Sequence, residues 1–442
     1  MPPSPRKAGP PGPPPPPSPP APATPPPGPA RPEFWRSPLR GPWLTAVFGL
    51  LLLFGVTVLF ATGLLSYAAY NPDLAPVNDQ TPGKGWLGFY LFSWPTSPYW
   101  LYRLTQGVHV VLGVVLVPVL LAKLWSVIPK LFAWPPVRSP GQGIERLSLL
   151  LLVGGAGFEF ATGILNIQLH YVFPGSFYTL HFYGAWVFIG AFVVHVSLRL
   201  PRAIRAVRAG HAAQPAAGSE EAAGLVSPRP AQPTLSRRGA VGLVGLGSLA
   251  LFAVTAGQSV GGRWRRTALL APHGGRDPGA GPNGFQINKT AGSVGIRPSD
   301  TGPAWRLTVR GAGRQAVLTR EQLLAMPQHE AALPIACVEG WSTPDQLWSG
   351  VRLTDLAALV GLGGPDGDVP HVLVESVQRG GPFGSAALRD NQVRDRRALL
   401  AVRVNGAVLS PDHGYPARVI VPGAPGVLNT KWVTRLTFGE PA

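Results

Sequence analysis

Long runs of apolar residues, not alternating patterns, dominate the chain up to Gly261. One run extends from Trp43 to Tyr70 without a charged residue, and another covers about Leu180 to Leu198. The other three lie between Arg103 and Lys123, after Arg146 with Glu159 inside the run, and between Arg238 and Arg263. A helix needs about 20 apolar residues to cross the hydrocarbon core of a bilayer. The pattern therefore predicts five transmembrane helices.

After Gly261 the pattern changes to short apolar runs separated by Gly/Pro turns. Charged residues return, and the runs are rich in Val, Leu and Ile, which is typical of strands. The runs are 305–309, 372–374, 399–402 and 419–421. Short helices are expected at 319–326 and 353–361. This pattern predicts an α+β, mostly β domain of about 175 residues, large enough for its own hydrophobic core.

These patterns divide the chain into five segments. Residues 1–40 form a disordered cytoplasmic tail, because more than half of the first 32 residues are Pro and such a segment cannot bury a core. The other segments are a four-helix membrane domain over 41–200, a cytoplasmic linker over 201–236, the fifth helix over 237–262 and the outer domain over 264–442.

The positive charge of the chain is concentrated beside the apolar runs. Thirty-eight Lys and Arg against 21 Asp and Glu give a net charge of +17. Basic residues gather in the tail and in the second and fourth connections: Arg31, Arg36 and Arg40; Lys123, Lys130, Arg138 and Arg146; Arg199, Arg202, Arg205, Arg208, Arg237 and Arg238. Cytoplasmic loops carry an excess of Lys and Arg. We therefore expect a multi-pass protein of the cell membrane, with a cytoplasmic N-terminus and an extracytoplasmic C-terminal domain, and no nucleic-acid partner.

The fifth run follows a pair of arginines. The segment from Ser236 to Val241 resembles a twin-arginine export signal placed inside the chain. Arg237 and Arg238 are equally compatible with two ordinary cytoplasmic flanking residues, and the sequence leaves both interpretations open.

Three histidines lie inside the apolar runs, where a polar side chain is costly and needs a function or a partner. His181 and His195 are 14 residues apart and share a helix face, about 21 Å from each other. His109 lies near the outer end of its helix, at a depth similar to that of His181. Two neutral imidazoles on facing helices are the axial ligands of a six-coordinate b-type haem. A structural role in helix packing is the alternative.

Glu159 indicates either a polar pocket with a proton path or an ordinary partnered carboxylate.

The residues around these histidines carry a resemblance. Gln106–His109 and His181–Trp186, within about residues 37–200, resemble the haem-b subunits of membrane formate dehydrogenases and hydrogenases. The resemblance implies a cytochrome b domain with haem b on His109 and His181. In that family a second haem uses a His at the start of the first helix, and Gly41–Leu44 contains none here. His195 stays a candidate ligand of a second haem.

Cys337 is the single cysteine of the chain. One cysteine excludes an intrachain disulfide, a CxxC redox pair and a multi-cysteine metal site. A buried free cysteine is commonly a small hydrophobic residue. Its thiolate can also be the one protein ligand of a metal whose other ligands come from a cofactor.

The residues around Cys337 favour the role of a metal ligand. Leu333–Ser342, His413–Arg418, Val421–Gly423 and Lys431–Trp432 resemble the sulfite oxidase family of molybdenum cofactor enzymes. The resemblance implies that Cys337 ligates molybdenum in a molybdenum–molybdopterin cofactor. It also implies that His413, Arg418 and Lys431 hold the pterin and its phosphate. Asn288 is a further candidate for a cofactor contact.

The residues that follow Cys337 depart from the sulfite-oxidising pattern. Val338–Trp341 is acidic and aromatic, which suits an anionic substrate poorly, and resembles the branch containing periplasmic methionine sulfoxide reductases. The expected function is oxygen-atom transfer on a small molecule or a protein sulfoxide outside the membrane, with electrons exchanged with haem b and quinone, and with the reductase direction favoured. The alternative is a non-catalytic membrane haem carrier or sensor whose outer domain serves only docking.

Overall fold

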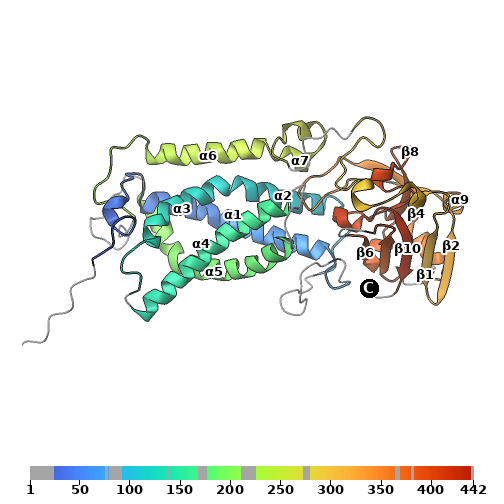
Figure 1. Cartoon of the computed structure of the whole chain (residues 1–442), viewed down its shortest axis with the longest axis horizontal. Coiled ribbons are helices and arrows are strands. Elements are labelled where there is room, and N and C mark those ends of the chain that lie inside the picture. Colours follow the sequence, from blue (N-terminus) through green and yellow to red (C-terminus); the bar gives the residue numbers. More distant parts are fainter. Residues whose placement is uncertain are drawn as a thin grey trace, which may run out of the picture.

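The computed structural model contains an elongated helical region and a mostly β region at one end of it (Figure 1). It describes residues 24–74, 78, 92–137, 139–167, 177–210, 225–271, 279–363, 369–379 and 383–439. Most of the predicted tail and the middle of the predicted linker lie outside these residues.

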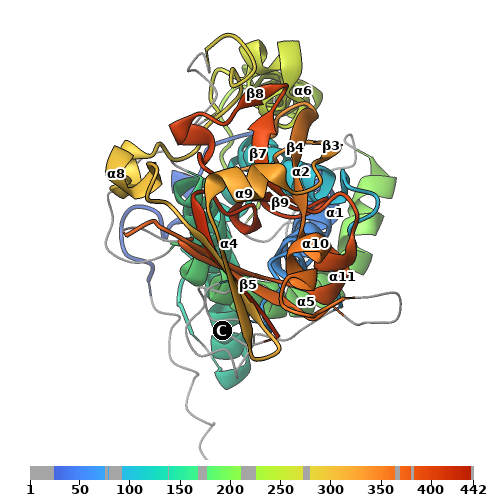
Figure 2. The ribbon, with the colours of Figure 1, turned by 90° about the vertical axis from the view of Figure 1, so that its right-hand side faces the viewer.

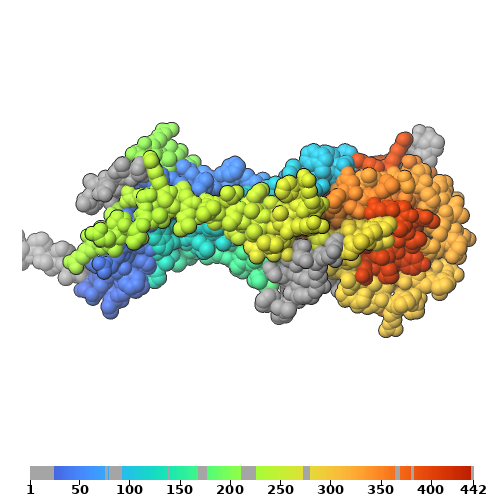
Figure 3. All heavy atoms as spheres, turned by 90° about the horizontal axis from the view of Figure 1, so that it is seen from above, coloured from blue at the N-terminus to red at the C-terminus, as the bar shows by residue number. Residues whose placement is uncertain are grey.

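The helical region is built around one long apolar helix. Its helices are α1 (Pro42–Ala69), α2 (Leu101–Val115), α3 (Val117–Leu131), α4 (Pro140–Asn166), α5 (Phe177–Ala209), α6 (Arg237–Ala253) and α7 (Gly257–Val260), with the 3₁₀ turns η1 (Pro32–Phe34) and η2 (Gly262–Thr267). α1 packs against α2, α3 and α5, while α4 packs against α5. α6 lies along the outside of α2 and α3 (Figures 1 and 3). The predicted helical region with several apolar helices is confirmed.

The second apolar run forms two helices rather than one. α2 and α3 meet at Leu116 at an angle of 41°. Pro118 lies in the first turn of α3, where its missing N–H and its ring prevent the preceding helix from continuing straight. Among the described residues, four helices are long and apolar enough to cross a membrane, or five if α2 and α3 form one span.

The helices pack closely on one side and leave apolar side chains on the other. Leu44, Phe48 and Leu52 of α1 belong to a buried cluster that includes Leu116. A Cβ at Gly55 would lie 2.4 Å from the Leu116 side chain, so glycine permits this approach. Large apolar side chains of α4, α5 and α6 stay exposed, among them Leu147, Leu150, Val193, Leu198, Leu243, Leu246 and Leu249. Many exposed large apolar side chains along several helices are typical of a membrane or partner interface.

The C-terminal region contains two sheets (Figure 2). The first has the order β2 (Arg314–Leu318), β1 (Leu307–Gly311), β10 (Val433–Phe438), β5 (Val372–Ser376), β6 (Ser385–Leu388), with β1 and β10 parallel and the other pairs antiparallel. The second has the order β3 (His329–Leu333), β4 (Gln346–Arg352), β7 (Leu399–Val404), β8 (Ala407–Val408), and β9 (Arg418–Ile420) also pairs with β7. The short helices are α8 (Pro298–Thr301), α9 (Arg320–Ala325), α10 (Leu353–Ala358) and α11 (Asp390–Arg394), and the 3₁₀ turns are η3 (Gly292–Val294), η4 (Pro411–His413) and η5 (Gly426–Leu428). The predicted mostly β region is confirmed.

Hydrophobic clusters stabilise this region, and two of them are large. The larger one includes Leu307, Val351 and Leu436, each fully buried. The smaller one gathers Phe285, Trp341 and Trp348 around Cys337. Cys337 therefore lies at the edge of a rigid aromatic core.

The two regions are joined by buried polar contacts. The Asn71 amide, at the end of α1, donates to Gln392 Oε1 over 2.8 Å, and both side chains are fully buried. Gly340 lies directly on α2, where a Cβ would be 2.7 Å from Val110 Cβ. Because Gly340 also has a φ of +87°, only glycine suits this contact. The loop that carries Cys337 is thus seated on the end of the helical region.

Candidate functional site

A cavity of about 590 Å³ lies where the two regions meet. Helices α1, α2, α4 and α5 form one part of its wall, and residues 288–289, 337–339 and 383 form another. The cavity brings together His109, His181, Asn288 and Cys337, which are far apart in the sequence. Its volume is in the usual range for a cofactor or ligand site.

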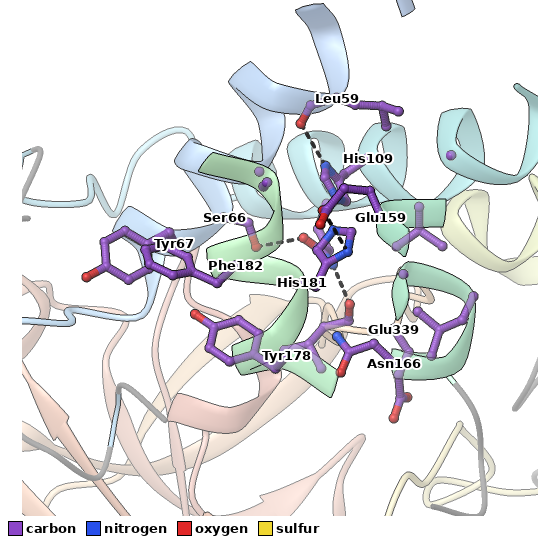
Figure 4. A pocket seen from close by; sticks show the side chains of 18 of the residues that line it. Leu59, Ser66, Tyr67, His109, Glu159, Asn166, Tyr178, His181, Phe182 and Glu339 are labelled. Carbon is purple, nitrogen blue, oxygen red and sulfur yellow. Dashed lines mark hydrogen bonds and ion pairs between the residues drawn. The ribbon is translucent and has the colours of Figure 1, made fainter. Parts of the chain in front are cut away.

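Two imidazoles face each other across this cavity. The ring centroids of His109 and His181 are 6.2 Å apart, with an angle of 88° between the ring planes. Nδ1 of His109 lies 3.0 Å from the Leu59 carbonyl oxygen, and Nδ1 of His181 lies 3.2 Å from Glu159 Oε2. Figure 4 shows the two rings side by side, each held from a neighbouring helix.

These partners determine the tautomers. A carbonyl oxygen only accepts hydrogen bonds, so Nδ1 of His109 carries the proton. The Thr162 hydroxyl donates to the Phe158 carbonyl over 2.7 Å, so its oxygen accepts from Nδ1 of His181 at 3.1 Å. In both rings Nε2 is left as the nitrogen that can bind a metal. This arrangement, with Nδ1–H held by an acceptor, is typical of metal-binding histidines.

His195 has different surroundings. It lies on α5 but is not among the described residues that line the cavity. The charged groups that act on it are Lys123, Arg199 and Lys130. The structure therefore pairs His109 with His181 and leaves His195 apart from them.

Cys337 is held in a tight turn between β3 and β4. Its backbone N–H donates to the Trp341 carbonyl over 2.8 Å, and its carbonyl accepts from the Gly340 N–H over 3.1 Å. The thiol, 2% exposed, donates to Glu339 Oε2 over 3.2 Å, and the Trp341 indole donates to the same oxygen over 2.8 Å. Burial, followed by the nearby Glu339 carboxylate, raises the pKa of the Cys337 thiol well above its usual range. A bound cation would reverse this preference and stabilise the thiolate.

Arg418 and Lys431, together with the His413 imidazole, form a cationic cluster next to this loop. Arg418, 4% exposed, begins β9, and its Nη1 donates to the His413 carbonyl over 3.4 Å. Lys431 Nζ donates to the carbonyls of Lys289 and Asp412 over 2.7 and 2.9 Å. Burial lowers the pKa of Arg418 to about 10 and that of Lys431 well below its usual value.

The cationic cluster lacks a matching anion at Arg418. Within the described ranges no carboxylate lies at ion-pair distance from Arg418, and its buried Nε has no hydrogen-bond partner. An uncompensated buried charge is costly, and a phosphate matches the donor geometry of a guanidinium. The residues present therefore fit the phosphate end of a cofactor, as they fit a soft metal at Cys337.

Residues 283–285 hold the His413 side chain of this cluster in place. His413 Nε2 donates to the Asn283 carbonyl over 2.9 Å, and its ring stacks on Phe285 at 3.8 Å. Burial, and then Arg418, lower the pKa of His413 to about 3, so the imidazole is neutral. Asn288 lines the cavity, and its Oδ1 accepts from the Lys289 backbone N–H over 2.8 Å.

A repeated segment lies beside the imidazoles and was not among the sequence-based predictions. Phe60–Leu65 reads Phe-Ala-Thr-Gly-Leu-Leu and Phe160–Leu165 reads Phe-Ala-Thr-Gly-Ile-Leu. Thr62 and Thr162 contact His109 and His181, respectively. A search for short internal repeats would have found both segments. Glu339 also had no assigned role, although its position two residues after Cys337 placed it beside the thiol.

Comparison with known proteins identifies a domain in the C-terminal region. Residues 294–441 match the oxidoreductase molybdopterin binding domain family. The chain is 32% identical over 168 residues to a mitochondrial sulfite oxidase of Drosophila melanogaster, covering 33% of this chain and 28% of that protein. It is 32% identical over 135 residues to the uncharacterized oxidoreductase YuiH of Bacillus subtilis (strain 168), covering 30% of this chain and 65% of that protein. The solved structure of the sulfane dehydrogenase SoxCD from Paracoccus pantotrophus aligns at 26% identity with a TM-score of 0.27. The alignment covers 31% of this chain and 38% of that chain.

The C-terminal region thus carries a molybdopterin-binding oxidoreductase domain with sulfite oxidase homologues, as the residues around Cys337 predicted. The chain spans less than two thirds of the length of either relative.

Proposed function

We propose that this chain is a membrane-bound molybdenum-cofactor oxidoreductase that transfers an oxygen atom on a small substrate or a protein sulfoxide and exchanges electrons with haem b and quinone. The observation that carries the proposal is the shared cavity, because Cys337 and the facing imidazoles of His109 and His181 line one space. Two redox groups in contact with one cavity need no diffusing carrier between them.

Cys337 and the cationic cluster would hold the molybdenum cofactor. When bound, the molybdenum centre supplies two-electron oxygen-atom transfer. The Cys337 thiolate would be the protein ligand, and Arg418, Lys431 and His413 would hold the pterin and its phosphate. Asn288 would contact the cofactor from the cavity wall.

Glu339 favours the reductase direction. Its Oε2 accepts from both Cys337 and Trp341, which fixes a carboxylate beside the metal-binding sulfur. A carboxylate there repels sulfite and other anions and tolerates a neutral S-oxide or N-oxide. In this direction a sulfoxide takes up two electrons and two protons and yields the sulfide and water. A quinol that is oxidised to quinone supplies both.

His109 and His181 would be the axial ligands of haem b. When bound, haem supplies one-electron transfer. Nδ1 of each ring is held by an acceptor on α1 or α4, which aims Nε2 into the cavity. The exposed apolar faces of α4, α5 and α6 and the basic flanks support a membrane location with an extracytoplasmic β region.

Metal and haem analysis of the full chain in detergent tests the proposal. We expect molybdenum and haem b together in the purified protein, and turnover of S-oxides or N-oxides with a reduced quinol or dye donor. Sulfite with an oxidised dye tests the reverse direction. Haem without molybdenum would refute the enzyme and leave the carrier or sensor, whereas molybdenum without haem would refute the electron route.

A further inference from the structure

The repeated segments of α1 and α4 occupy equivalent positions in the structure. The Thr62 hydroxyl donates to the Val58 carbonyl over 2.8 Å, and the Thr162 hydroxyl donates to the Phe158 carbonyl over 2.7 Å. Each threonine oxygen lies 3.1 Å from Nδ1 of a histidine on the next helix of its pair, His109 for Thr62 and His181 for Thr162. The two contacts are therefore the same in kind and in length.

The glycines that follow the threonines are equivalent as well. A Cβ at Gly63 would lie 3.2 Å from Cε1 and 3.7 Å from Nδ1 of His109. A Cβ at Gly163 would lie 3.2 and 3.7 Å from the same atoms of His181. A side chain at either position would press on the imidazole. Both glycines line the cavity.

We infer that α1–α2 and α4–α5 are two copies of one half-site, in which each Thr–Gly pair positions one imidazole. This inference rests on the proposed binding of haem b. Each threonine hydroxyl donates its hydrogen to a backbone carbonyl, so its oxygen can only accept a hydrogen bond from Nδ1–H of the imidazole. This acceptor fixes the tautomer of the ring. Each glycine leaves the space that the ring needs to point Nε2 into the cavity. The four residues are positioning residues and do not touch the iron.

The two half-sites differ at one equivalent position. Leu59 and Glu159 each offer a backbone carbonyl to the imidazole, and Glu159 adds its carboxylate, 3.2 Å from Nδ1 of His181. Each imidazole therefore keeps an acceptor when its threonine is removed. Loss of a threonine should change the strength of the iron–imidazole bond rather than abolish haem binding.

The test measures the haem midpoint potential and the low-spin absorption and electron paramagnetic resonance spectra of the full chain in detergent. Thr62→Val and Thr162→Val should keep haem and shift the potential upward, because an imidazole that loses a hydrogen-bond acceptor is a weaker donor to iron. Thr62→Ser and Thr162→Ser should restore the wild-type potential. Gly63→Ala and Gly163→Ala should each lose most of the low-spin haem.

Matched controls lie on the same helices. Thr57 of α1 is exposed and makes the same bond, to the Leu53 carbonyl over 2.7 Å, so Thr57→Val should leave the potential unchanged. A Cβ at Gly157 of α4 would meet nothing within 4 Å, so Gly157→Ala should leave the spectrum unchanged.

The outcomes separate this inference from the proposed function. Wild-type potentials in both Val variants, or full low-spin spectra in both Ala variants, would overturn the inference while the haem remains. A response from only one of the two repeats would overturn their equivalence. A wild-type protein without haem would refute the haem proposal and the inference together.

Discussion

The rings of His109 and His181 lie 6.2 Å apart and nearly perpendicular to each other, with Nδ1 of each held by an acceptor on a different helix. We expect His109→Ala and His181→Ala each to abolish the low-spin haem spectrum, since a six-coordinate haem needs both imidazoles. Absorption spectra and a pyridine haemochrome assay of the purified variants measure this.

His195 provides the control for this pair. It lies outside the described lining of the cavity, among Lys123, Lys130 and Arg199. His195→Ala should therefore keep the haem content and spectrum of the wild type. Loss of half of the haem in this variant would instead indicate a second haem on His195.

Cys337→Ser tests the proposed molybdenum ligand. A hydroxyl is a poor substitute for a thiolate at a soft metal, so turnover should fall below detection. The haem spectrum should be unchanged because the imidazoles are held from α1 and α4. Turnover at the wild-type rate would remove Cys337 from the mechanism.

Arg418→Met tests the anion site of the cationic cluster. Methionine keeps most of the volume and removes the guanidinium whose Nε lacks a partner within the described residues. We expect molybdenum occupancy to fall about tenfold at limiting cofactor, the equivalent of ~1.4 kcal/mol. Arg435→Met, at a half-exposed residue paired with Glu375 over 3.3 Å, is the control and should keep its molybdenum. Equal occupancy in both variants would contradict the assignment.

We expect His413 to make the stability of the apoprotein depend on pH. Its pKa is about 3 in the folded chain, and an unfolded histidine titrates near about 6.5. Between these values the unfolded state binds more protons. The free energy of unfolding should therefore fall by up to a few kcal/mol as pH drops from about 6.5 toward 3. Above about 6.5 this group adds no pH dependence.

His413→Gln isolates this contribution from that of the carboxylates. Glutamine can still donate to the Asn283 carbonyl but has no proton to gain in this range. Thermal melting of the cofactor-free full chain in detergent, from pH 7.5 to 4.5, should show a shallower loss of stability in the variant. Identical slopes would show that His413 is not the group responsible.

The helical region and the C-terminal domain were predictable from sequence, because their signals are local. The lengths of the apolar runs predicted the helices, and the residues around Cys337 predicted the molybdopterin-binding domain that the comparisons confirm. The bend at Leu116 was not predicted, although Pro118 was visible, because proline is tolerated in many apolar helices. The roles assigned to all the site residues stay predictions, and the structure places His109, His181, Asn288 and Cys337 on one cavity.

The sequence by itself determined where the apolar helical region and the mostly β region lie, and which residue types are available for metal and anion binding. Each of these depends on neighbours along the chain. Only the tertiary structure decided that the Gln106 amide donates a hydrogen bond to the Val338 carbonyl, 232 positions away, and that Gly340 packs on Val110. Such contacts depend on how two folded surfaces match, and no local pattern encodes this match. That match is what places Cys337 and the two imidazoles in one cavity.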